Sequence, residues 1–220
     1  SSYNQLFQFA TTKGIAVCVA SGDNGSTDGT SALSVDFPSS SPYVIACGGT
    51  TITNINTGAE TVWSYNPTYG WGGGGGLSTK FASLRSSVVY PDLHSTTPNV
   101  DSLITAKNRS VPDISLNADP SSGWSIYFNG HLYVSAFGGT SCVSPAFSGF
   151  LGLVNKNFGT ANPIDSLYNA PSNAFRDITV GSNDNAPSGV KVYDARVGFD
   201  QCTGRGSVNG TVLANYILTH

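Results

Sequence analysis

Apolar residues follow first a helical and then a strand-like spacing at the start of the chain. Within residues 3–12 the apolar side chains fall on one side of a helix, and Gly14 follows where a helix C-cap glycine would stand. Two continuous apolar runs come next, residues 15–20 and 43–47, and a turn containing glycine closes each of them. Such runs are typical of strands that are buried on both faces. The pattern therefore predicts a short helix followed by strands of a parallel sheet.

A hairpin and a long helix dominate the second half of the pattern. Asn129-Gly130 separates two strand-like segments, and this pair is the one that a two-residue hairpin turn prefers. Over residues 140–158 apolar residues recur at helical spacing with small residues between them, and Gly159 caps the end. We expect an α/β fold with a parallel core sheet and hairpin insertions. The other expected strands are residues 50–53, 61–65, 111–118 and 124–136.

Composition narrows the classes of protein to which the chain can belong. Charged residues make up 10% of the sequence, and the formal net charge is −3, whereas an average soluble protein has roughly 25% charged residues. This balance excludes the basic surface of a nucleic-acid-binding protein. Hydrophobic residues, at 39%, are sufficient for a packed core and exclude disorder. No apolar run reaches the roughly 18 residues that suggest a membrane span.

Cysteines and sequons bear on the compartment. No pair of the four cysteines has C-x-x-C spacing, which argues against a zinc or thioredoxin-type motif. Cys18 and Cys47 both lie in strand-like runs, and the sequence leaves open whether they form a disulfide or remain two buried thiols. N-x-S/T sequons at Asn24, Asn108 and Asn209 favour secretion or an acidic lumenal compartment, as a glycoprotein would require.

Two short motifs carry the candidate chemistry. Gly138-Gly139-Thr140-Ser141 leads into the predicted helix, where free N–H groups and the helix dipole stabilise an oxyanion. An N-cap is the competing interpretation of this motif. Ser21-Gly22-Asp23 follows a buried strand, the end at which α/β sheets bind ligands, although an Asx-turn explains Asp23 equally. The glycine run at residues 70–76 lacks the Gly-Lys-Ser/Thr of a phosphate loop and is interpreted as a tight backbone passage.

Taken together, the two motifs resemble the hallmark pair of the sedolisins, or serine-carboxyl peptidases, and most resemble the kumamolisin type. The resemblance covers about residues 5–215. It implies a subtilisin-like α/β fold with a parallel central sheet, of which residues 1–220 would be the C-terminal part of a single peptidase catalytic domain. Further matching motifs are Asp36-Phe37-Pro38, Cys47-Gly48-Gly49-Thr50, Val111-Pro112-Asp113-Ile114-Ser115, Ala118-Asp119-Pro120, Phe175-Arg176-Asp177-Ile178-Thr179 and Gly198-Phe199-Asp200-Gln201-Cys202.

The resemblance implies a role for both hallmark residues. Ser141 would be the nucleophile that forms an acyl-enzyme, and Asp23 would donate a hydrogen bond to the oxyanion together with the Ser141 N–H. Only a protonated carboxyl group can donate such a bond. Asp23 therefore predicts an enzyme that works at acid pH, whereas an Asn at this position would act at any pH.

The general base of the family is missing from the chain. It is a Glu in a Glu-x-x-x-Asp helix upstream of Ser-Gly-Asp, but Glu60 is the single Glu and lies downstream. None of the three histidines, His94, His131 and His220, stands in a subtilisin-type motif. We therefore expect the base in an upstream segment or a partner N-terminal chain, as in a zymogen cut into two chains. The alternative is a catalytically inactive binding or regulatory module with a peptidase-like fold.

The resemblance also implies a structural calcium site within residues 175–204. Asp177 and Asp200 would supply carboxylate oxygens, and Ile178, Arg196 and Gly198 would supply backbone carbonyls, the oxygen ligands that Ca²⁺ prefers. The family often has Gly where Arg196 stands.

Asp36 is a candidate specificity residue. In kumamolisin-like relatives an acid at this position can line the pocket for the residue before the cut bond, which would favour Arg or Lys there. The expected substrates are peptides or proteins, and the expected location is outside the cell or in a lysosome-like acidic compartment.

Overall fold

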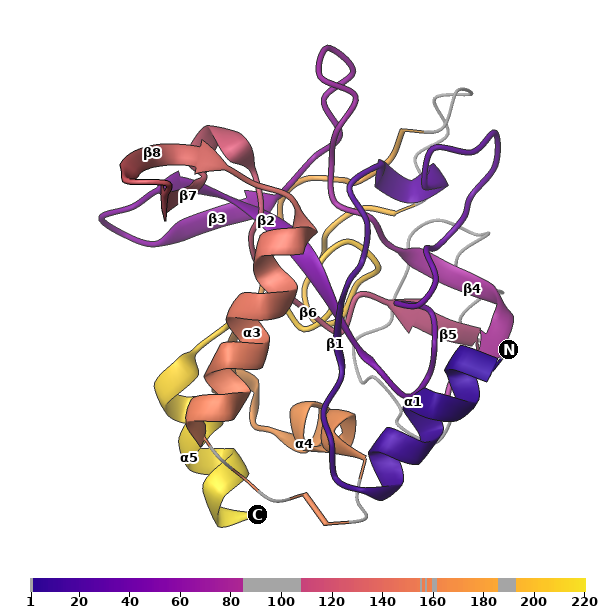
Figure 1. Ribbon diagram of the computed structural model, residues 1–220. Coiled ribbons are helices and arrows are strands. Elements are labelled where there is room, and N and C mark those ends of the chain that lie inside the picture. Colours follow the sequence, from indigo (N-terminus) through magenta and orange to yellow (C-terminus); the bar gives the residue numbers. More distant parts are fainter. Residues whose placement is uncertain (1, 85–107, 155, 157, 160–161, 186–192) are drawn as a thin grey trace.

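A mostly parallel sheet forms the centre of the molecule. The computed structural model describes residues 2–84, 108–154, 156, 158–159, 162–185 and 193–220. Within them six strands form one sheet: five follow the order β1-β2-β6-β10-β9, and the sixth, β3, pairs with β2 (Figure 1). The pairs β1–β2, β2–β6 and β6–β10 are parallel, which confirms the predicted α/β class. The strands are β1 (Cys18–Ala20), β2 (Ile45–Asn54), β3 (Ala59–Val62), β6 (Ile114–Asn117), β9 (Phe175–Arg176) and β10 (Ser207–Val208).

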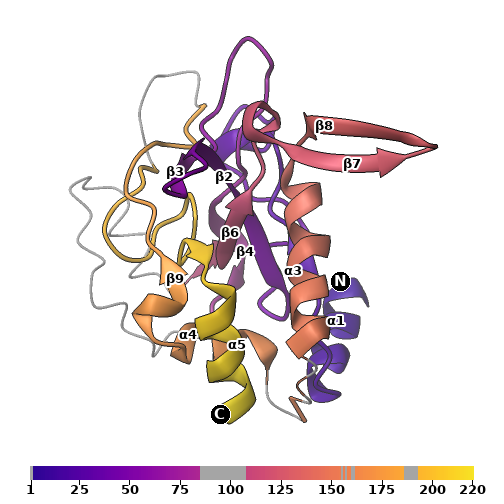
Figure 2. The same cartoon turned by 90° about the vertical axis from the view of Figure 1, so that its left-hand side faces the viewer.

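Two small antiparallel sheets and, among the described residues, four α-helices surround this centre. The Asn129-Gly130 turn joins β7 (Trp124–Phe128) to β8 (His131–Phe137), as its residue types predict, and Figure 2 shows this hairpin extending away from the body. The other small sheet pairs β4 (Gly76–Ala82) with β5 (Asn108–Val111). The helices are α1 (Ser2–Thr12), α3 (Thr140–Val154), α4 (Pro163–Asn169) and α5 (Gly210–Thr219), and 3-10 turns lie at η1 (Gly25–Thr27), η2 (Pro120–Ser122) and η3 (Ser172–Ala174).

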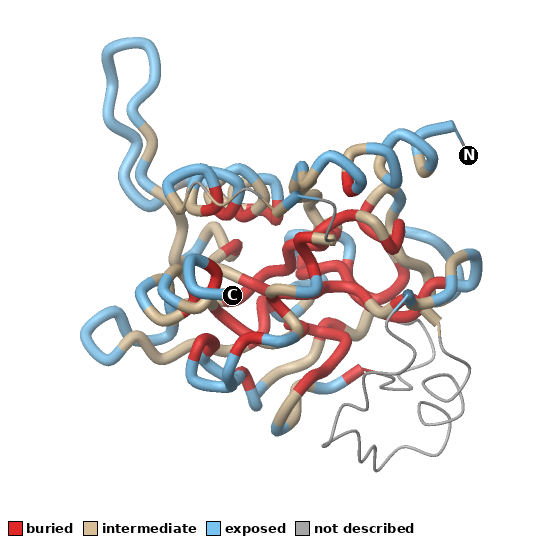
Figure 3. Tube along the Cα trace, turned by 90° about the horizontal axis from the view of Figure 1, so that it is seen from below, coloured by how far each residue is buried: buried red, intermediate tan, exposed pale blue. Residues whose placement is uncertain are grey.

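The main core lies between the sheet and α3. Val143, Phe147 and Leu151 recur every four residues on the buried side of this helix, which packs across β1 and β2 (Figure 2). Side chains four residues apart lie on one face of a helix, so this spacing directs all three against the sheet. Figure 3 shows the buried stretches gathered in the interior of the molecule. The packing places the first turn of α3 beside the carboxyl end of β1.

Several element boundaries differ from the sequence pattern. The expected strand 61–65 is β3, which ends at Val62, and residues 111–118 are divided between the end of β5 and β6. The run 15–20 yields only the three residues of β1, and these are half-buried rather than enclosed, because β1 ends the hydrogen-bonded strand order of the described sheet. Residues 43–47 and 50–53 belong largely to one strand, β2, since Gly48 and Gly49 continue the ladder instead of ending it. Helix α3 ends at Val154, four residues before the expected end.

A buried ion pair ties together the far end of the sheet. Arg109 and Asp113 are 2% and 0% exposed, and two N–O contacts of 2.5 and 2.6 Å join them. Asp113 also accepts hydrogen bonds from the Ala46 N–H and the Tyr168 hydroxyl, at 2.7 and 2.5 Å. Arg109 donates in addition to the Ser41 carbonyl. Because a buried charge requires such partners, this network joins β2, β5, β6 and α4 into one unit.

Candidate active site

Asp23 and the first turn of α3 meet through Thr140. Asp23 follows β1, and its Oδ1 atom accepts hydrogen bonds from both the backbone N–H and the hydroxyl of Thr140, each at 2.7 Å. The Thr140 hydroxyl also lies 3.2 Å from the N and O atoms of Gly22. Thr140 is fully buried. Its hydroxyl is therefore bonded to the Ser21-Gly22-Asp23 segment, so Thr140 does not act simply as an N-cap.

Gly139 makes room for the other oxygen of Asp23. A Cβ atom at Gly139 would lie 2.7 Å from Asp23 Oδ2, and the φ angle of this glycine is +92°. Both facts exclude an ordinary L side chain at the position. Oδ1 is thus occupied as an acceptor, and Oδ2 lies against the backbone that leads to Ser141.

Ser141 is the second residue of α3 and is exposed, although Thr140 before it is buried. The N–H groups of a first helical turn have no partner within the helix, so the Ser141 N–H is not engaged in the helical ladder. Cys142 is bonded back to the loop, with its N–H on the Gly139 carbonyl and its Sγ 3.4 Å from the Gly138 carbonyl. The structure therefore brings an exposed serine hydroxyl, a helix N-terminus and the Asp23 carboxyl to the same edge of the sheet.

The glycine run packs against the Asp23 segment. The N–H groups of Gly72 and Gly74 donate to the carbonyls of Asp23 and Gly22, at 3.0 and 2.7 Å. A Cβ atom at Gly74 would lie 2.4 Å from the Ser21 carbonyl oxygen. The glycines permit this close backbone contact, as a tight passage requires. Sequence reasoning recognised the tight passage but not its location beside Asp23.

Asp36 lies near Gly22, and Asp28 is a second carboxyl that the sequence analysis missed. The nearest atoms to a Cβ placed on Gly22 include Asp28 Oδ1 and Asp36 Cβ. Burial raises the pKa of Asp36, and the neighbouring Asp23 raises it further. Burial also raises the pKa of Asp28, with a further contribution from Asp36. The carboxyl groups of Asp23, Asp28 and Asp36 therefore lie around one strand end. The only sign of this in the sequence is that all three occur in the same Gly- and Ser-rich loop.

The proposed calcium ligands meet in one loop. Asp177 accepts a hydrogen bond from the Gly198 N–H at 2.8 Å, and Asp200 accepts one from the Arg196 N–H at 3.2 Å. Asp200 is 0% exposed, and burial raises its pKa to about 6. Ile178 is buried beside them. In the part of the chain that the structure describes, no three His, Cys, Asp or Glu side chains form a metal-binding group, so such a site would need backbone carbonyls.

Glu60 has a structural role, since its carboxylate links neighbouring strands. Its two carboxylate oxygens accept hydrogen bonds from the hydroxyls of Thr50 and Ser207, at 2.6 and 2.8 Å, and so join β3 to β2 and β10. His131 and His220 are exposed at the hairpin turn and at the last residue, whereas His94 lies outside the described residues. Cys18 and Cys47 are free thiols on neighbouring strands. Glu60 is thus engaged with Thr50 and Ser207 and is not the base for Ser141.

The parallel sheet, the helix α3 with Ser141 in its first turn, and Asp23 at the neighbouring strand end define a subtilisin-like fold of the serine-peptidase type. The profile of the subtilase family matches residues 1–199. The chain is 38% identical to kumamolisin from Bacillus sp. (strain MN-32) over 229 residues and 34% identical to sedolisin from Pseudomonas sp. (strain 101) over 237 residues, covering 99% of this chain in both cases. The chain belongs to the subtilase family and, within it, to the sedolisins.

Solved structures agree with this placement. A structure of Pseudomonas sedolisin, a serine-carboxyl proteinase complexed with two molecules of pseudo-iodotyrostatin, superimposes with a TM-score of 0.79 at 33% identity. The match covers 99% of this chain and 59% of that one. Sphericase shares the fold alone, with a TM-score of 0.54 at 19% identity and coverage of 93% of this chain and 51% of that one. The chain spans 39% of kumamolisin and 37% of sedolisin from the curated relatives.

Proposed function

We propose that the chain is the C-terminal part of the catalytic domain of an acid-acting serine-carboxyl endopeptidase. The observation that carries the proposal is the pair of hydrogen bonds from Thr140 to Asp23, which orients the Asp23 carboxyl beside Ser141. A geometry that holds a carboxyl group next to an exposed serine at a helix N-terminus suits acyl transfer. Peptides and proteins are the proposed substrates.

In the proposed reaction the Ser141 hydroxyl attacks the carbonyl carbon of the scissile peptide bond. A Glu–Asp pair of an upstream segment or partner chain accepts the hydroxyl proton and then delivers it to the leaving amine. The C–N bond breaks, and an acyl ester remains on Ser141 until water, activated by the same base, hydrolyses it. Each of the two tetrahedral intermediates carries a negative oxygen that requires donors beside Ser141.

Two donors face this oxygen in the proposed mechanism. The Ser141 N–H is one, and the positive end of the α3 dipole supports it. A protonated Oδ2 of Asp23 is the other, because Oδ1 already accepts two hydrogen bonds and lacks a proton to donate. The neutral acid form of Asp23 is thus the active one, and this accounts for the proposed acid optimum.

We also propose a structural calcium ion in the loop of residues 175–204. The donor set fits, because Asp177 and Asp200 approach the same segment, and the hydrogen bonds to the buried Asp200 carboxylate from the described residues come from backbone N–H groups and a hydroxyl rather than from a cationic side chain. Ca²⁺ bound there would link the two carboxylates to the carbonyls of Ile178, Arg196 and Gly198. Its role is to tie down the C-terminal loop and not to take part in the reaction.

Asp36 is the proposed determinant on the acyl side of the cut bond, where its carboxyl would favour Arg or Lys. It lies beside Gly22 and hence beside the Asp23 segment. The proposed location is an acidic extracellular or lysosome-like compartment, since Asp23 must be protonated to act. Among the described residues no helix is long and apolar enough to cross a membrane.

The experiment compares Ser141→Ala with Ser144→Ala in the complete natural protein, using internally quenched peptides at acid pH. Ser144 lies on the same helix one turn further along, so it controls for effects on folding. We expect the first variant to lose activity and the second to retain it. Denaturing mass analysis with sequencing of the same material should identify a segment that contains Glu-x-x-x-Asp, either upstream in the chain or on a partner chain.

The alternative function is that of an inactive binding module, and the absence of Glu-x-x-x-Asp from these residues favours it. A protein that binds peptides without cleaving them, and that contains no Glu-x-x-x-Asp segment, would support this alternative. Undiminished cleavage by the Ser141→Ala protein would contradict the proposed peptidase mechanism.

A further inference from the structure

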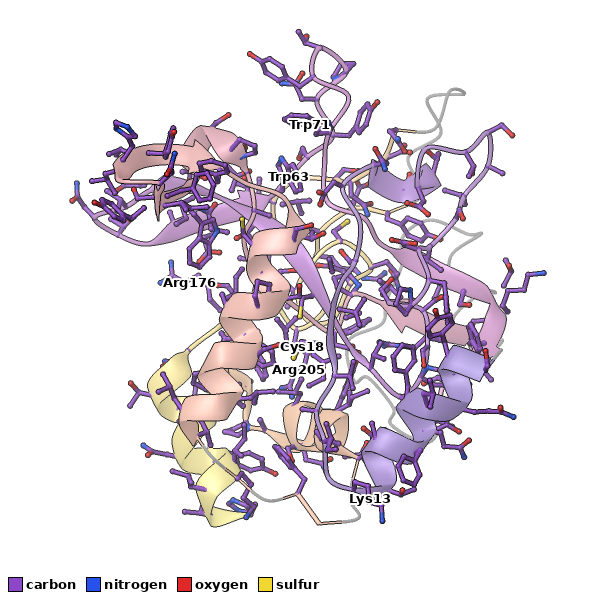
Figure 4. The ribbon with its side chains drawn as sticks, viewed as in Figure 1. Lys13, Cys18, Trp63, Trp71, Arg176 and Arg205 are labelled. Atoms are coloured by element: carbon purple, nitrogen blue, oxygen red, sulfur yellow. The ribbon has the colours of Figure 1, made fainter. Side chains whose placement is uncertain are left out.

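An aromatic pocket opens beside the candidate active site. Its volume is about 290 Å³, close to the lower end of ligand-binding pockets. Figure 4 shows Trp63 and Trp71 above the upper end of α3, where the chain enters Ser141. The main lining residues are Trp63, Asn66, Tyr69, Trp71, Asp119 and Pro120.

The aromatic rings of the pocket differ in exposure. Trp63 is 4% exposed and forms the buried part of the lining, whereas Trp71 and Tyr69 are 53% and 68% exposed. Gly49 permits the position of the Trp63 ring, because a Cβ atom there would lie 2.8 Å from Trp63 Cε3. Exposed aromatic residues around a hollow are typical of a binding surface.

Backbone hydrogen bonds hold the exposed aromatic residues in place. The N–H of Asn66 donates to the Trp71 carbonyl and the N–H of Gly70 donates to the Asn66 carbonyl, each at 2.7 Å. The Asn66 side chain accepts a further bond from the Thr68 N–H at 2.9 Å. The loop that carries Tyr69 and Trp71 is therefore closed by its own bonds, which fix this wall of the pocket.

Both walls of the pocket are connected to the catalytic segments. Gly72, next to Trp71, donates its N–H to the Asp23 carbonyl at 3.0 Å. Pro120 packs against Gly138, since a Cβ atom at Gly138 would lie 2.6 Å from Pro120 Cδ. The pocket thus adjoins Asp23 at one wall and the segment leading to Ser141 at the other.

Asp36 approaches the site from a different direction. It lies against Gly22, whereas the pocket residue Pro120 lies against Gly138, and the Asp23–Thr140 hydrogen bonds join the two segments that follow these glycines. A peptide that crosses Ser141 with its acyl part toward Asp36 therefore directs its leaving part toward the pocket.

The charged side chain of the lining, Asp119, already accepts two hydrogen bonds. Asp119 Oδ1 accepts a hydrogen bond from the Ser121 N–H, and Oδ2 accepts one from the Thr51 hydroxyl, both at 2.8 Å. Beside the polar side chains of Ser64, Asn66 and Ser121, the lining offers a ligand the apolar surface of the two indoles, the Tyr69 ring and the proline. Aromatic rings pack favourably on such surfaces in offset or edge-to-face arrangements.

We propose that this pocket binds an aromatic side chain of the substrate on the leaving-group side, one or two residues after the cut bond. The inference rests on the proposed peptidase function and adds to it the substrate class that the second half of the site selects. Trp71 is then a specificity residue that touches the substrate.

Kinetics on the complete natural enzyme test the proposal. One peptide series keeps the acyl half constant and places Gly, Lys or Phe at the first or second position after the cut. We expect Trp71→Ala to lower kcat/KM for the Phe peptides by roughly 10-fold and to leave the Gly peptides nearly unchanged. Tyr127→Ala, which removes another exposed aromatic residue on β7, should change neither series.

Several results would overturn the proposal. An equal loss on all peptides after Trp71→Ala, or a wild-type preference for Lys over Phe at both positions, excludes an aromatic subsite while leaving the peptidase function intact. Undiminished peptide cleavage by the Ser141→Ala protein instead excludes the proposed peptidase mechanism.

A binding measurement tests the pocket independently of peptide cleavage. Calorimetry on the same complete protein compares Phe-Ala-Ala-amide with Gly-Ala-Ala-amide, which represent the leaving half of a substrate. The pocket is supported if the wild type binds the Phe peptide more tightly, Trp71→Ala abolishes this preference and Trp71→Phe retains it. Equal binding of the two peptides excludes the pocket for the first position after the cut, and equal binding of Ala-Phe-Ala-amide and Ala-Gly-Ala-amide excludes it for the second.

Discussion

Thr140 donates two hydrogen bonds to one oxygen of Asp23, from its backbone N–H and from its hydroxyl, each 2.7 Å long. The two residues are 117 positions apart in the chain. Two donors on one oxygen hold the carboxyl plane in a single orientation and leave the second oxygen, Oδ2, to carry a proton. The strand end and the helix start are thereby joined at the point where the proposed chemistry takes place.

The Thr140 hydroxyl should act as a positioning group for Asp23. Thr140→Val keeps the N–H bond and the side-chain volume but removes the hydroxyl donor. We expect kcat to fall by about 10-fold or more with little change in KM, because a misaligned donor stabilises the transition state less well. Thr140→Ser should restore most of the activity, and a Val variant with unchanged kcat would contradict the role.

Asp23→Asn should change the pH dependence of the complete enzyme. The aspartate donates only when it is protonated, so activity falls as pH rises and its carboxyl ionises. An amide donates at every pH, and the variant should therefore retain a larger fraction of its activity toward neutral pH. Ratios of kcat/KM at a series of pH values measure this, and identical profiles for both proteins would exclude Asp23 as the donor.

Gly139→Ala should abolish activity while the fold remains. The new Cβ atom would lie 2.7 Å from Asp23 Oδ2, and a φ of +92° costs about 1–3 kcal/mol for an L side chain. Gly149→Ala on the exposed side of α3 meets nothing within 4 Å and should raise stability by about 0.5–1 kcal/mol. Peptide hydrolysis and thermal unfolding of the two variants provide the comparison.

Asp113→Asn should destabilise the fold strongly. The variant leaves the buried Arg109 guanidinium without its anionic partner, which costs about 3–5 kcal/mol. Tyr168→Phe removes a single hydrogen bond to the same carboxylate and should cost about 1–3 kcal/mol. Denaturant unfolding measures both free energies, and equal effects would show that the Arg109–Asp113 ion pair is not the dominant interaction.

Calcium should stabilise the protein through Asp200. Burial raises the pKa of this carboxyl to about 6, above its ordinary value in the unfolded chain. The folded state therefore holds the proton longer, and without a cation stability falls as pH rises through the window from about 4 to about 6.

Added Ca²⁺ offsets this loss, so it should raise Tm above pH 6 in the wild type and not in Asp200→Asn. The exposed Asp165→Asn serves as the control and should keep the calcium response. A calcium response in Asp200→Asn equal to that of the wild type would remove Asp200 from the ligand set.

Local pattern was sufficient for the elements that have a strong period or a strong turn. The amphipathic helix α1, the Asn129-Gly130 hairpin and the start of α3 all lie where the sequence predicts them. Helices α4 and α5 were missed, although Asn162 and Asn209 cap their first turns with side-chain hydrogen bonds. Strands β9 and β10 have only two residues each, too few for any period to be visible.

The candidate site likewise contains residues that local motifs identify and residues that only the structure identifies. The motifs around Asp23 and Ser141 were identifiable because each combines a glycine-rich turn with an apolar element. Asp28, the aromatic pocket at Trp71 and the packing of the glycine run were not identifiable. Their positions depend on contacts between segments far apart in the chain, and no local spacing encodes such contacts.

The sequence by itself determined a glycine-rich α/β chain with few charged residues, a serine at a helix start and an aspartate at a strand end. Only the tertiary structure decided that these two ends meet, through the bond between Thr140 and Asp23. The physical reason is that side-chain period and turn residues act over a few neighbouring positions. The orientation of a carboxyl group depends instead on donors that the packing of α3 against β1 and β2 brings to it.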